Sequence, residues 1–145
     1  MASFREPTST EKFFNRAMGF LVSIGFAPSY MQLLEVRGRK SGKLYTTPVD
    51  LLELDGKRYL VAPRGRTQWV RNAEVSGEVT LKRGSTRQSF VLRALNDVEK
   101  LPILKAYLDR FKTAVQRYFT VPAGSPPEAF AEVATTYPAF ELLEK

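Results

Sequence analysis

Between residues 31 and 95, apolar and polar residues alternate over short runs, and this pattern predicts β-strands. We expect strands over residues 31–37, 44–54 and 57–62, and two more within residues 77–95 around a turn near Gly84. Five or six antiparallel strands at hairpin spacing predict a small barrel or sandwich rather than alternating strand–helix units.

Two local signals refine the predicted strands. Asp55 and Gly56 stand between the second and third runs, and this dipeptide suits the positive φ angles of a tight hairpin turn. Pro48 lies inside the second run and has no N–H to donate to a ladder. We therefore expect an edge, a bulge or a bend at that position.

Two other segments space their apolar residues as a helix does. Residues 11–26 predict an amphipathic helix with Thr10 as its N-cap. Its polar face is not rich in Lys and Arg, so packing on a protein core is favoured over lying on a membrane surface. The second helix carries an apolar face made of Leu101, Leu104, Leu108, Phe111, Val115 and Phe119.

The start of this second helix carries conflicting signals. Asn96 and Glu99 have the spacing of a capping box. Pro102 indicates that the first turn is irregular or that the helix starts later. We expect a loop over residues 120–128 and a short further helix beginning within residues 127–136.

Length and composition fit one soluble domain over residues 1–145. Hydrophobic residues make up 43% and charged residues 26%, which is ordinary for a globular protein of mixed α+β class, mainly β. No apolar run reaches the about 18 residues of a membrane-spanning helix. The first residues lack a basic segment followed by an apolar core, so we expect no secretory signal and a cytoplasmic location. Peripheral membrane contact stays an alternative.

The absence of Cys and His narrows the chemistry. The chain contains neither residue. This excludes disulfides, thiol nucleophiles and Ser-His-Asp catalysis, and we expect no metal site. Proton transfer at neutral pH must then use Tyr, Lys, a carboxylate, water or a cofactor. The net charge of +7 predicts attraction to anions without saying which anion.

The segment 37–43, "RGRKSGK", places four cations before the second strand. Gly38 and Gly42 allow tight backbone bends, and Arg39, Lys40 and Ser41 can surround a phosphate or carboxylate. A solvated basic hairpin tip explains the same residues equally well. The spacing of a P-loop is not present.

A second basic segment follows the third strand, over residues 59–72. It turns at Pro63 and Gly65, and "TQWVRN" (67–72) predicts a short helix whose N-terminus near Thr67 would attract an anion. Trp69 is the only Trp in the chain and is as readily explained as a core residue. The cations of the two segments, which we expect to converge on one side of the barrel, are Arg37, Arg39, Lys40, Lys43, Arg64, Arg66 and Arg71.

Five ordered motifs between residues 33 and 82 resemble the deazaflavin-dependent nitroreductase family. They are a "GRKSG" turn, a strand with "TPV", a "DG" hairpin, a "VA" strand end and a "WVRN" segment. The resemblance implies a split β-barrel of about six antiparallel strands with flanking N- and C-terminal helices. It also implies an oxidoreductase that uses reduced coenzyme F-420.

The resemblance assigns roles to residues in each motif. Arg39, Lys40, Ser41 and Gly42 would bind the anionic tail, and Thr47 and Pro48 would line the deazaflavin ring. The loop wrapping the cofactor and the segment closing its site would be Ala62, Pro63, Arg64, Gly65, Arg66, Thr67, Gln68, Trp69 and Asn72.

The chain also departs from the family pattern. Tyr45 stands where many members have Arg, and we include it among the cofactor-binding residues. In the C-terminal segment, Tyr137 is kept as the candidate proton donor. Phe140 stands where a second hydroxyl would fall, and we expect the chain to stop before a further strand.

We therefore expect reduced F-420 to pass a hydride to a small conjugated acceptor such as a quinone or a nitroaromatic compound. The acceptor would stack beneath apolar side chains such as Phe13, Phe14 or Phe140. FMN is the alternative cofactor. The rival functions are a non-catalytic carrier of F-420, FMN, haem or lipid, and nucleic-acid binding, for which the strands lack an aromatic–basic alternation. Both a monomer and a homodimer stay open.

Overall fold

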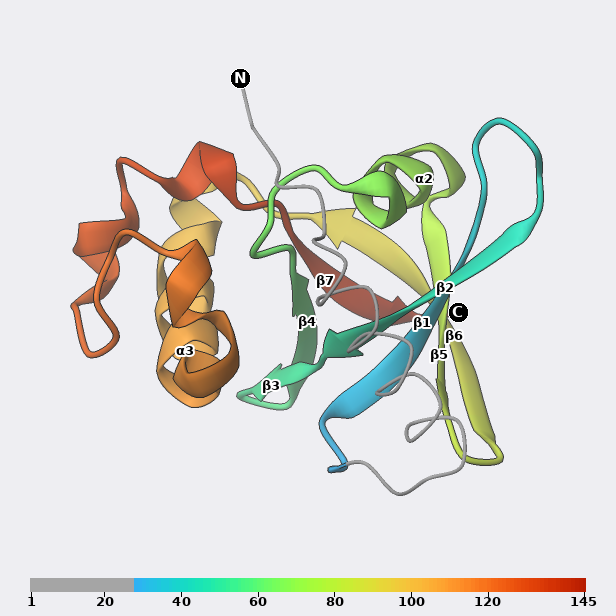
Figure 1. Ribbon diagram of the computed structural model, residues 1–145, viewed down its shortest axis with the longest axis horizontal. Coiled ribbons are helices and arrows are strands. Elements are labelled where there is room, and N and C mark those ends of the chain that lie inside the picture. The colour runs from blue at the N-terminus through green and yellow to red at the C-terminus, as the bar shows by residue number, and fades with distance from the viewer. Residues whose placement is uncertain (1–27) are drawn as a thin grey trace.

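The computed structural model describes residues 28–145 as a curled antiparallel sheet with helices packed against it (Figure 1). The predicted helix over residues 11–26, with Phe13 and Phe14, lies outside the described residues. Seven strands form the sheet: β1 (Met31–Arg37), β2 (Leu44–Asp50), β3 (Leu52–Leu54), β4 (Lys57–Val61), β5 (Glu78–Arg83), β6 (Thr86–Ala94) and β7 (Ala139–Glu144).

The strand order brings the two edges of the sheet together. The order is β2-β1-β5-β6-β7-β4-β3, so that β2 and β3 are the edge strands although only Leu51 separates them in the chain. β3 is three residues long and pairs with residues 57–59 of β4. Leu60 and Val61 of β4 therefore have β7 on one side and no strand of the described chain on the other. This incomplete closure between β2 and the end of β4 is the split of the barrel.

The predicted second strand is two strands. β2 ends at Asp50 and β3 begins at Leu52, so the break falls at Leu51 rather than at Pro48. Pro48 pairs with Leu33 on the edge strand β2, where a missing N–H can face away from the ladder. The expected hairpin turn is confirmed, because Asp55 and Gly56 have φ angles of 52° and 76°.

The expectation that the chain stops before a further strand is wrong. Residues 139–144 form β7, which lies between β4 and β6 and completes the middle of the sheet. Leu60 pairs with Phe140, and Leu92 pairs with Leu142. These partners stand about 50 to 80 residues away along the chain, so the local pattern after Pro138 does not show them.

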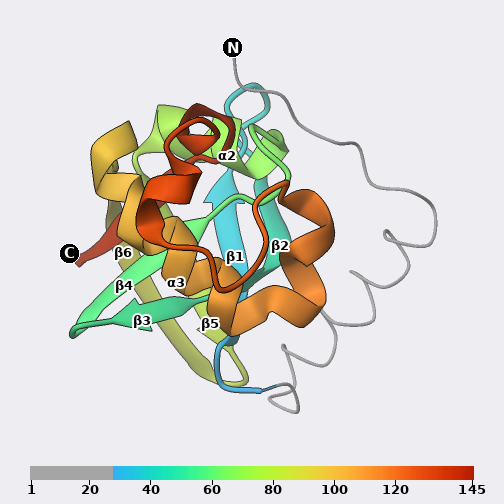
Figure 2. The same cartoon turned by 90° about the vertical axis from the view of Figure 1, so that its left-hand side faces the viewer.

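Within residues 28–145, two α-helices accompany the sheet (Figure 2). α2 (Gln68–Ser76) begins after Thr67, as predicted, and Gly77 ends it with a φ of 73°. α3 (Asp97–Val115) starts directly after Asn96 despite Pro102, because the predicted capping box is present. Residues 127–136 form two short 3-10 turns, η2 (Pro127–Phe130) and η3 (Ala134–Thr136), where one short helix was expected to begin. η1 (Gln116–Tyr118) follows α3 directly.

The buried side chains form two main clusters that position the helices. One fills the barrel between its strands and includes Leu34, Leu60 and Phe90, with Ala73 of α2 closing the end. The other packs α3 and the 3-10 turns against β3, β4 and the start of β7, through residues such as Leu104 and Phe130. α3 therefore covers the sheet beside the split.

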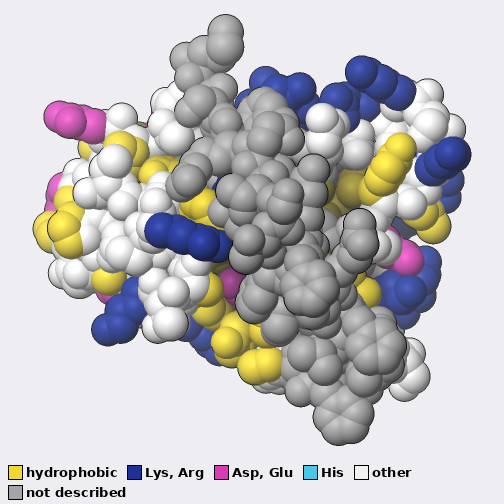
Figure 3. Space-filling view, viewed as in Figure 1, with side chains coloured by type: hydrophobic (Ala, Val, Ile, Leu, Met, Phe, Trp, Pro, Cys, Tyr) yellow, Lys and Arg dark blue, Asp and Glu magenta, His cyan; other side chains and the backbone are white. Residues whose placement is uncertain are grey.

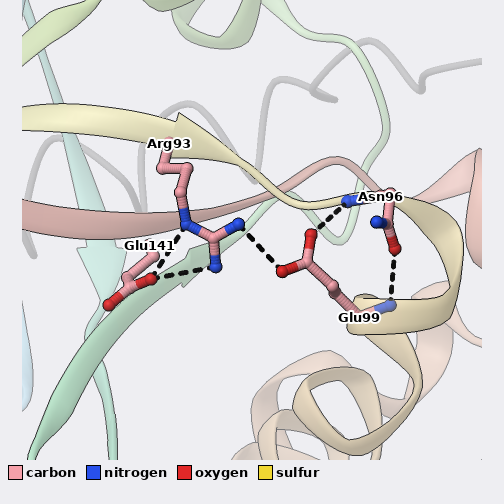
Figure 4. A network of polar contacts seen from close by, with 4 residues as sticks. All are labelled: Arg93, Asn96, Glu99 and Glu141. Atoms are coloured by element: carbon pink, nitrogen blue, oxygen red, sulfur yellow. Dashed lines mark hydrogen bonds and ion pairs between the residues drawn. The ribbon is translucent and has the colours of Figure 1, made fainter.

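A polar network fixes the first turn of α3 to the sheet (Figure 4). The Arg93 guanidinium on β6 donates to Glu141 on β7 at 3.0 Å and to Glu99 on α3 at 2.8 Å. Glu99 also accepts from the Asn96 backbone N–H at 3.0 Å. Glu141 is 8% exposed, and the Arg93 cation compensates the cost of burying its charge.

Candidate functional site

A groove of about 760 Å³ runs along the split of the barrel. One wall is the edge strand β2, from Thr47 to Asp50, and the opposite wall is the C-terminal half of α3 with η1. Residues 62–67 are called here the α2 loop. Val61 at the end of β4 and four residues of this loop, Ala62, Pro63, Arg64 and Thr67, line the groove as well. A space of this size accommodates a cofactor or a drug-sized ligand.

The α2 loop is held by its own backbone. The Gly65 N–H donates to the Ala62 carbonyl at 3.1 Å, and the Thr67 N–H donates to the Gly65 carbonyl at 2.9 Å. Gly65 has a φ of 85°, a conformation that suits glycine. These bonds turn the chain from β4 into α2 and bring the start of the helix to the groove.

Polar groups meet at this start of α2. Arg64 and Thr67 both line the groove. The Thr67 hydroxyl oxygen is buried and finds no hydrogen-bond partner within the described chain, and it does not cap α2. The unpaired helical N–H groups favour an anion at such a position.

The predicted aromatic side chain is at the groove. Trp69 lines it while half buried, and its ring lies 6.0 Å from the ring of Phe140. Phe140 is 4% exposed and packs with Ala62 and Val70 in a small third cluster. Phe140 therefore supports Trp69 from behind, whereas the prediction placed it against an acceptor.

Residues 38–43, called here the basic turn, dock on α2. The backbone N–H of Arg39 and its Nη1 both donate to the Asn72 Oδ1, at 3.0 and 2.8 Å, and the same Nη1 donates to the Gln68 Oε1 at 3.0 Å. Asn72 is buried, so its amide joins the two basic segments as a structural link. The predicted convergence of these segments is therefore present.

Residues 40–43 of the basic turn are exposed to solvent. Ser41 is exposed and accepts from the Lys43 N–H at 3.2 Å, and the Tyr45 hydroxyl lies 3.4 Å from its Oγ. Tyr45 is 50% exposed, and its ring covers Gly38, where an added Cβ would lie 2.5 Å from the Tyr45 Cε2. Lys and Arg side chains gather over this turn and α2 in Figure 3.

The predicted site residues thus divide between the groove and the surface beside it. Those that line the groove are Thr47, Pro48, Ala62, Pro63, Arg64, Thr67 and Trp69. Those outside its lining are Arg39, Lys40, Ser41, Gly42, Tyr45, Gly65, Arg66, Gln68, Asn72 and Tyr137. Of these, Arg66 forms an ion pair with Glu74 at 2.7 Å on the outer face of α2.

The structure gives the candidate proton donor Tyr137 a place in the core. Its side chain is 3% exposed, its ring stacks on Phe119 at 4.2 Å, and its hydroxyl donates to the Tyr118 carbonyl at 2.6 Å. Burial raises the pKa of this phenol. A hydroxyl in these contacts supports the packing after α3 and does not face the groove.

The sequence does not predict several residues of the groove, among them Asp50, Tyr107 and Arg110. Asp50 ends β2, and Tyr107 and Arg110 come from α3. Burial raises the pKa of the Asp50 carboxyl from its ordinary 3.8 to about 6. Burial, with smaller contributions from Asp50 and Tyr118, raises the pKa of Tyr107 well above its ordinary range. Their proximity depends on the packing of α3, which no local sequence signal reveals.

Residues 28–145 contain no group of three or more acidic, His or Cys side chains placed to hold a metal ion. In the same part of the chain, no helix combines the length and apolar character needed to cross a membrane.

Solved structures share the fold at low sequence identity. The Agrobacterium tumefaciens protein Atu2129, described as of unknown function, aligns over 88% of this chain with a TM-score of 0.57 and 18% identity. This chain spans only 53% of that protein. The F420-H2 dependent reductase FDR-A aligns over 79% of this chain and 94% of its own, with a TM-score of 0.52 and 20% identity.

The same fold carries other activities. The haem storage protein HutZ of Vibrio cholerae aligns over 80% of this chain and 82% of its own, with a TM-score of 0.55 and 11% identity. These likenesses confirm the split-barrel fold. No curated protein matches the sequence.

The sequence itself identifies the family. Residues 5–120 match the family described as F420H2-dependent quinone reductase. This match covers most of the chain, including all five motifs between residues 33 and 82, and it confirms the resemblance to deazaflavin-dependent reductases. The chain therefore belongs to the F420H2-dependent quinone reductase family.

Proposed function

We propose that this protein binds reduced F-420 in the groove and reduces a quinone or a similar conjugated acceptor there. The observation that carries the proposal is the groove itself, which combines an edge strand, an aromatic side chain and the cationic start of a helix. When bound, the reduced deazaflavin supplies the hydride. The family description names both the coenzyme and the class of acceptor.

The residues in the groove fit the parts of such a coenzyme. Thr47 and Pro48 of β2 would lie against the ring system, and Trp69 would close the site beside it. Arg64 and the start of α2 would hold the phosphate, and the buried Thr67 hydroxyl provides a donor that has no partner in the described chain.

The basic turn has a supporting role in this proposal. Arg39 is already bonded to Gln68 and Asn72, so it positions the turn against α2. Lys40 and Ser41 remain exposed beside α2 and would contact the anionic tail where it leaves the groove. Because exposed ion pairs contribute about 1 kcal/mol or less each, the tail would bind through several of them together.

We expect the protein to bind F-420 more tightly than FMN, because F-420 has a longer anionic tail. FMN carries a single phosphate, whereas F-420 extends past its phosphate to carboxylates that the basic turn can meet. Competition between FMN and F-420 on the same sample tests this preference. Tighter binding of FMN would assign the groove to a flavin.

Steady-state oxidation of reduced F-420 with a panel of quinones and nitroaromatic compounds tests the reaction. We expect acceptor-dependent oxidation above the uncatalysed rate, with quinones preferred. The variant Arg64→Gln should raise the KM for the coenzyme, whereas Lys57→Gln, the same charge change at the exposed start of β4, should not. Tight coenzyme binding without turnover of any acceptor would instead assign the protein as a carrier.

We also propose that the protein forms a homodimer. One structural neighbour, 18% identical and aligned over 92% of this chain, is described as a domain-swapped dimer. Sedimentation velocity over a range of concentrations measures the state directly, and a single monomeric species would contradict this proposal.

A further inference from the structure

Asp50 places a carboxyl group at the groove, directly after the TPV motif of β2. It is the last residue of β2, and the next residue, Leu51, is fixed by its N–H donating to the Tyr30 carbonyl at 2.8 Å. Tyr107 and Phe111 of α3 line the groove with it. The carboxyl is therefore held between the edge of the sheet and a helix.

The surroundings of Asp50 leave its charge uncompensated. Within residues 28–145, neither a hydrogen bond nor an ion pair reaches its carboxyl, and burial is the cause of its raised pKa of about 6. Arg110 lines the same groove, but its guanidinium lies over the rings of Tyr30 and Phe111, at 5.8 and 5.4 Å. The titratable and charged side chains that share the groove with Asp50 are Tyr30, Arg64, Tyr107, Arg110, Arg117 and Tyr118.

The two carboxylates of residues 28–145 that are buried, Glu35 and Glu141, are paired with cations. Glu35 has Lys82 at 3.3 Å and Arg87 at 2.7 Å, and Glu141 has Arg93 at 3.0 Å. The protein has a net charge of +7, yet no Lys or Arg among residues 28–145 forms an ion pair with Asp50. An unpaired carboxyl in a ligand groove is poised to exist as the neutral acid and to give up a proton.

We propose that Asp50 is the proton donor to the acceptor, a role that rests on the proposed function of the groove. The acceptor carbonyl compound gains a hydride from the reduced coenzyme. The O–H bond of Asp50 breaks as a new O–H bond forms on the acceptor oxygen, which for a quinone completes the hydroquinone. One acceptor, one hydride and one proton thus give one reduced product. The Asp50 carboxylate then regains a proton from solvent.

Asp50 is better suited to donate a proton than either Tyr107 or Tyr137. Tyr107 is almost fully buried and its raised pKa makes it a weaker acid than a free phenol. Tyr137 lies in the core. A carboxylic acid is far more acidic than a hydroquinone. Proton transfer from Asp50 to the oxygen of the reduced acceptor is therefore favourable.

The first test measures the pKa of the Asp50 carboxyl in the absence of any coenzyme. Carboxyl carbon chemical shifts of the free protein, followed by NMR over pH 4 to 8, should give Asp50 a pKa near 6, with the signal assigned by its absence in Asp50→Asn. Asp55, on the exposed hairpin turn, provides the comparison in the same spectra. A titration of Asp50 at its ordinary value would overturn the proposal whatever the protein catalyses.

The second test measures turnover of reduced F-420 with menadione across the same pH range. The wild-type kcat should fall as pH rises above about 6, since only the acid form of Asp50 donates. Asp50→Asn should lose on the order of 10²-fold in kcat and lose this pH dependence, with little change in coenzyme affinity. Asp55→Asn, which removes the same charge and suits the positive φ there, should behave as wild type.

The possible outcomes distinguish the role of Asp50 from the proposed reductase function on which it rests. A wild-type protein that turns over menadione, with Asp50→Asn giving the same kcat and pH profile, overturns the role of Asp50 and leaves the reductase intact. A wild-type protein that fails to bind F-420 overturns both. Partial recovery of Asp50→Ala by added formate would support proton donation, because a purely structural carboxyl would not be replaced by a free acid.

Discussion

The Asp50 carboxyl makes a quantitative prediction about folding stability that needs no cofactor. Replacing Asp50 with Asn keeps the side-chain shape and removes the charge that burial disfavours. The folded-state pKa is raised, so the native state binds more protons than the unfolded state between the two pKa values. The contribution of Asp50 to the stability of the wild type is then greatest at low pH and is lost as pH rises through about 6.

The size of the effect follows from the two pKa values. The pKa moves from 3.8 to about 6, and at 1.36 kcal/mol for each pKa unit the full cost of ionising Asp50 is about 3 kcal/mol. At pH 4.5 the same relation gives a cost of about 1 kcal/mol, because the folded-state acid is then still protonated. The stability advantage of Asp50→Asn over wild type should therefore grow by about 2 kcal/mol from pH 4.5 to pH 8.

Urea unfolding of both proteins at several pH values, followed by circular dichroism, measures this difference. The comparison uses each pair at equal pH, so the titration of other groups largely cancels. The control Asp55→Asn should show no widening gap, since Asp55 is exposed on its turn. A constant difference between wild type and Asp50→Asn over this pH range would refute the reasoning that burial raises the pKa of Asp50.

Three further substitutions test the framework around the groove. Asn72→Ala removes the acceptor of the Arg39 backbone N–H and guanidinium, and should cost about 1–3 kcal/mol of unfolding free energy in urea and speed amide exchange at Arg39. Asn96→Ala removes the cap of α3 and should cost about 1 kcal/mol, whereas Asn96→Ser should retain most of it. Gly65→Ala forces a β-carbon into the left-handed region and should cost about 1–2 kcal/mol while weakening coenzyme binding; unchanged affinity would separate the α2 loop from the site.

Local chemistry made several parts of the fold predictable. The Asp55–Gly56 turn needs positive φ angles, and the Asn96–Glu99 capping box needs two side chains three residues apart. Both depend on residues no more than three positions apart in the sequence, and both are confirmed. Thr67 likewise marks the start of α2 because the chain turns at Pro63 and Gly65 just before it.

Long-range packing made other parts unpredictable. β7 follows Pro138 at the C-terminus, and its partners on β4 and β6 are far away along the chain. The sequence predicts a reactive hydroxyl at Tyr137, because it does not show that Phe119 and the Tyr118 carbonyl enclose this side chain.

The candidate site likewise contains residues that local motifs predict and a residue that only long-range packing reveals. The motifs pointed to Thr47, Pro48, Arg64 and Trp69, which do line the groove. No such motif marks Asp50. From the sequence alone, a carboxyl at the end of a strand is expected to be solvated, and only the packing of α3 places it in the groove.

Binding of F-420 to the purified protein tests the central claim most directly. Quenching of deazaflavin fluorescence should show saturable binding at low micromolar protein. The tail-less deazaflavin riboside should bind more weakly, and added salt should reduce the difference between the two ligands because the tail binds through cations. FMN should not displace F-420 at equal concentration. An absence of saturable F-420 binding, or tighter binding of FMN, would contradict the assignment of this groove to a deazaflavin.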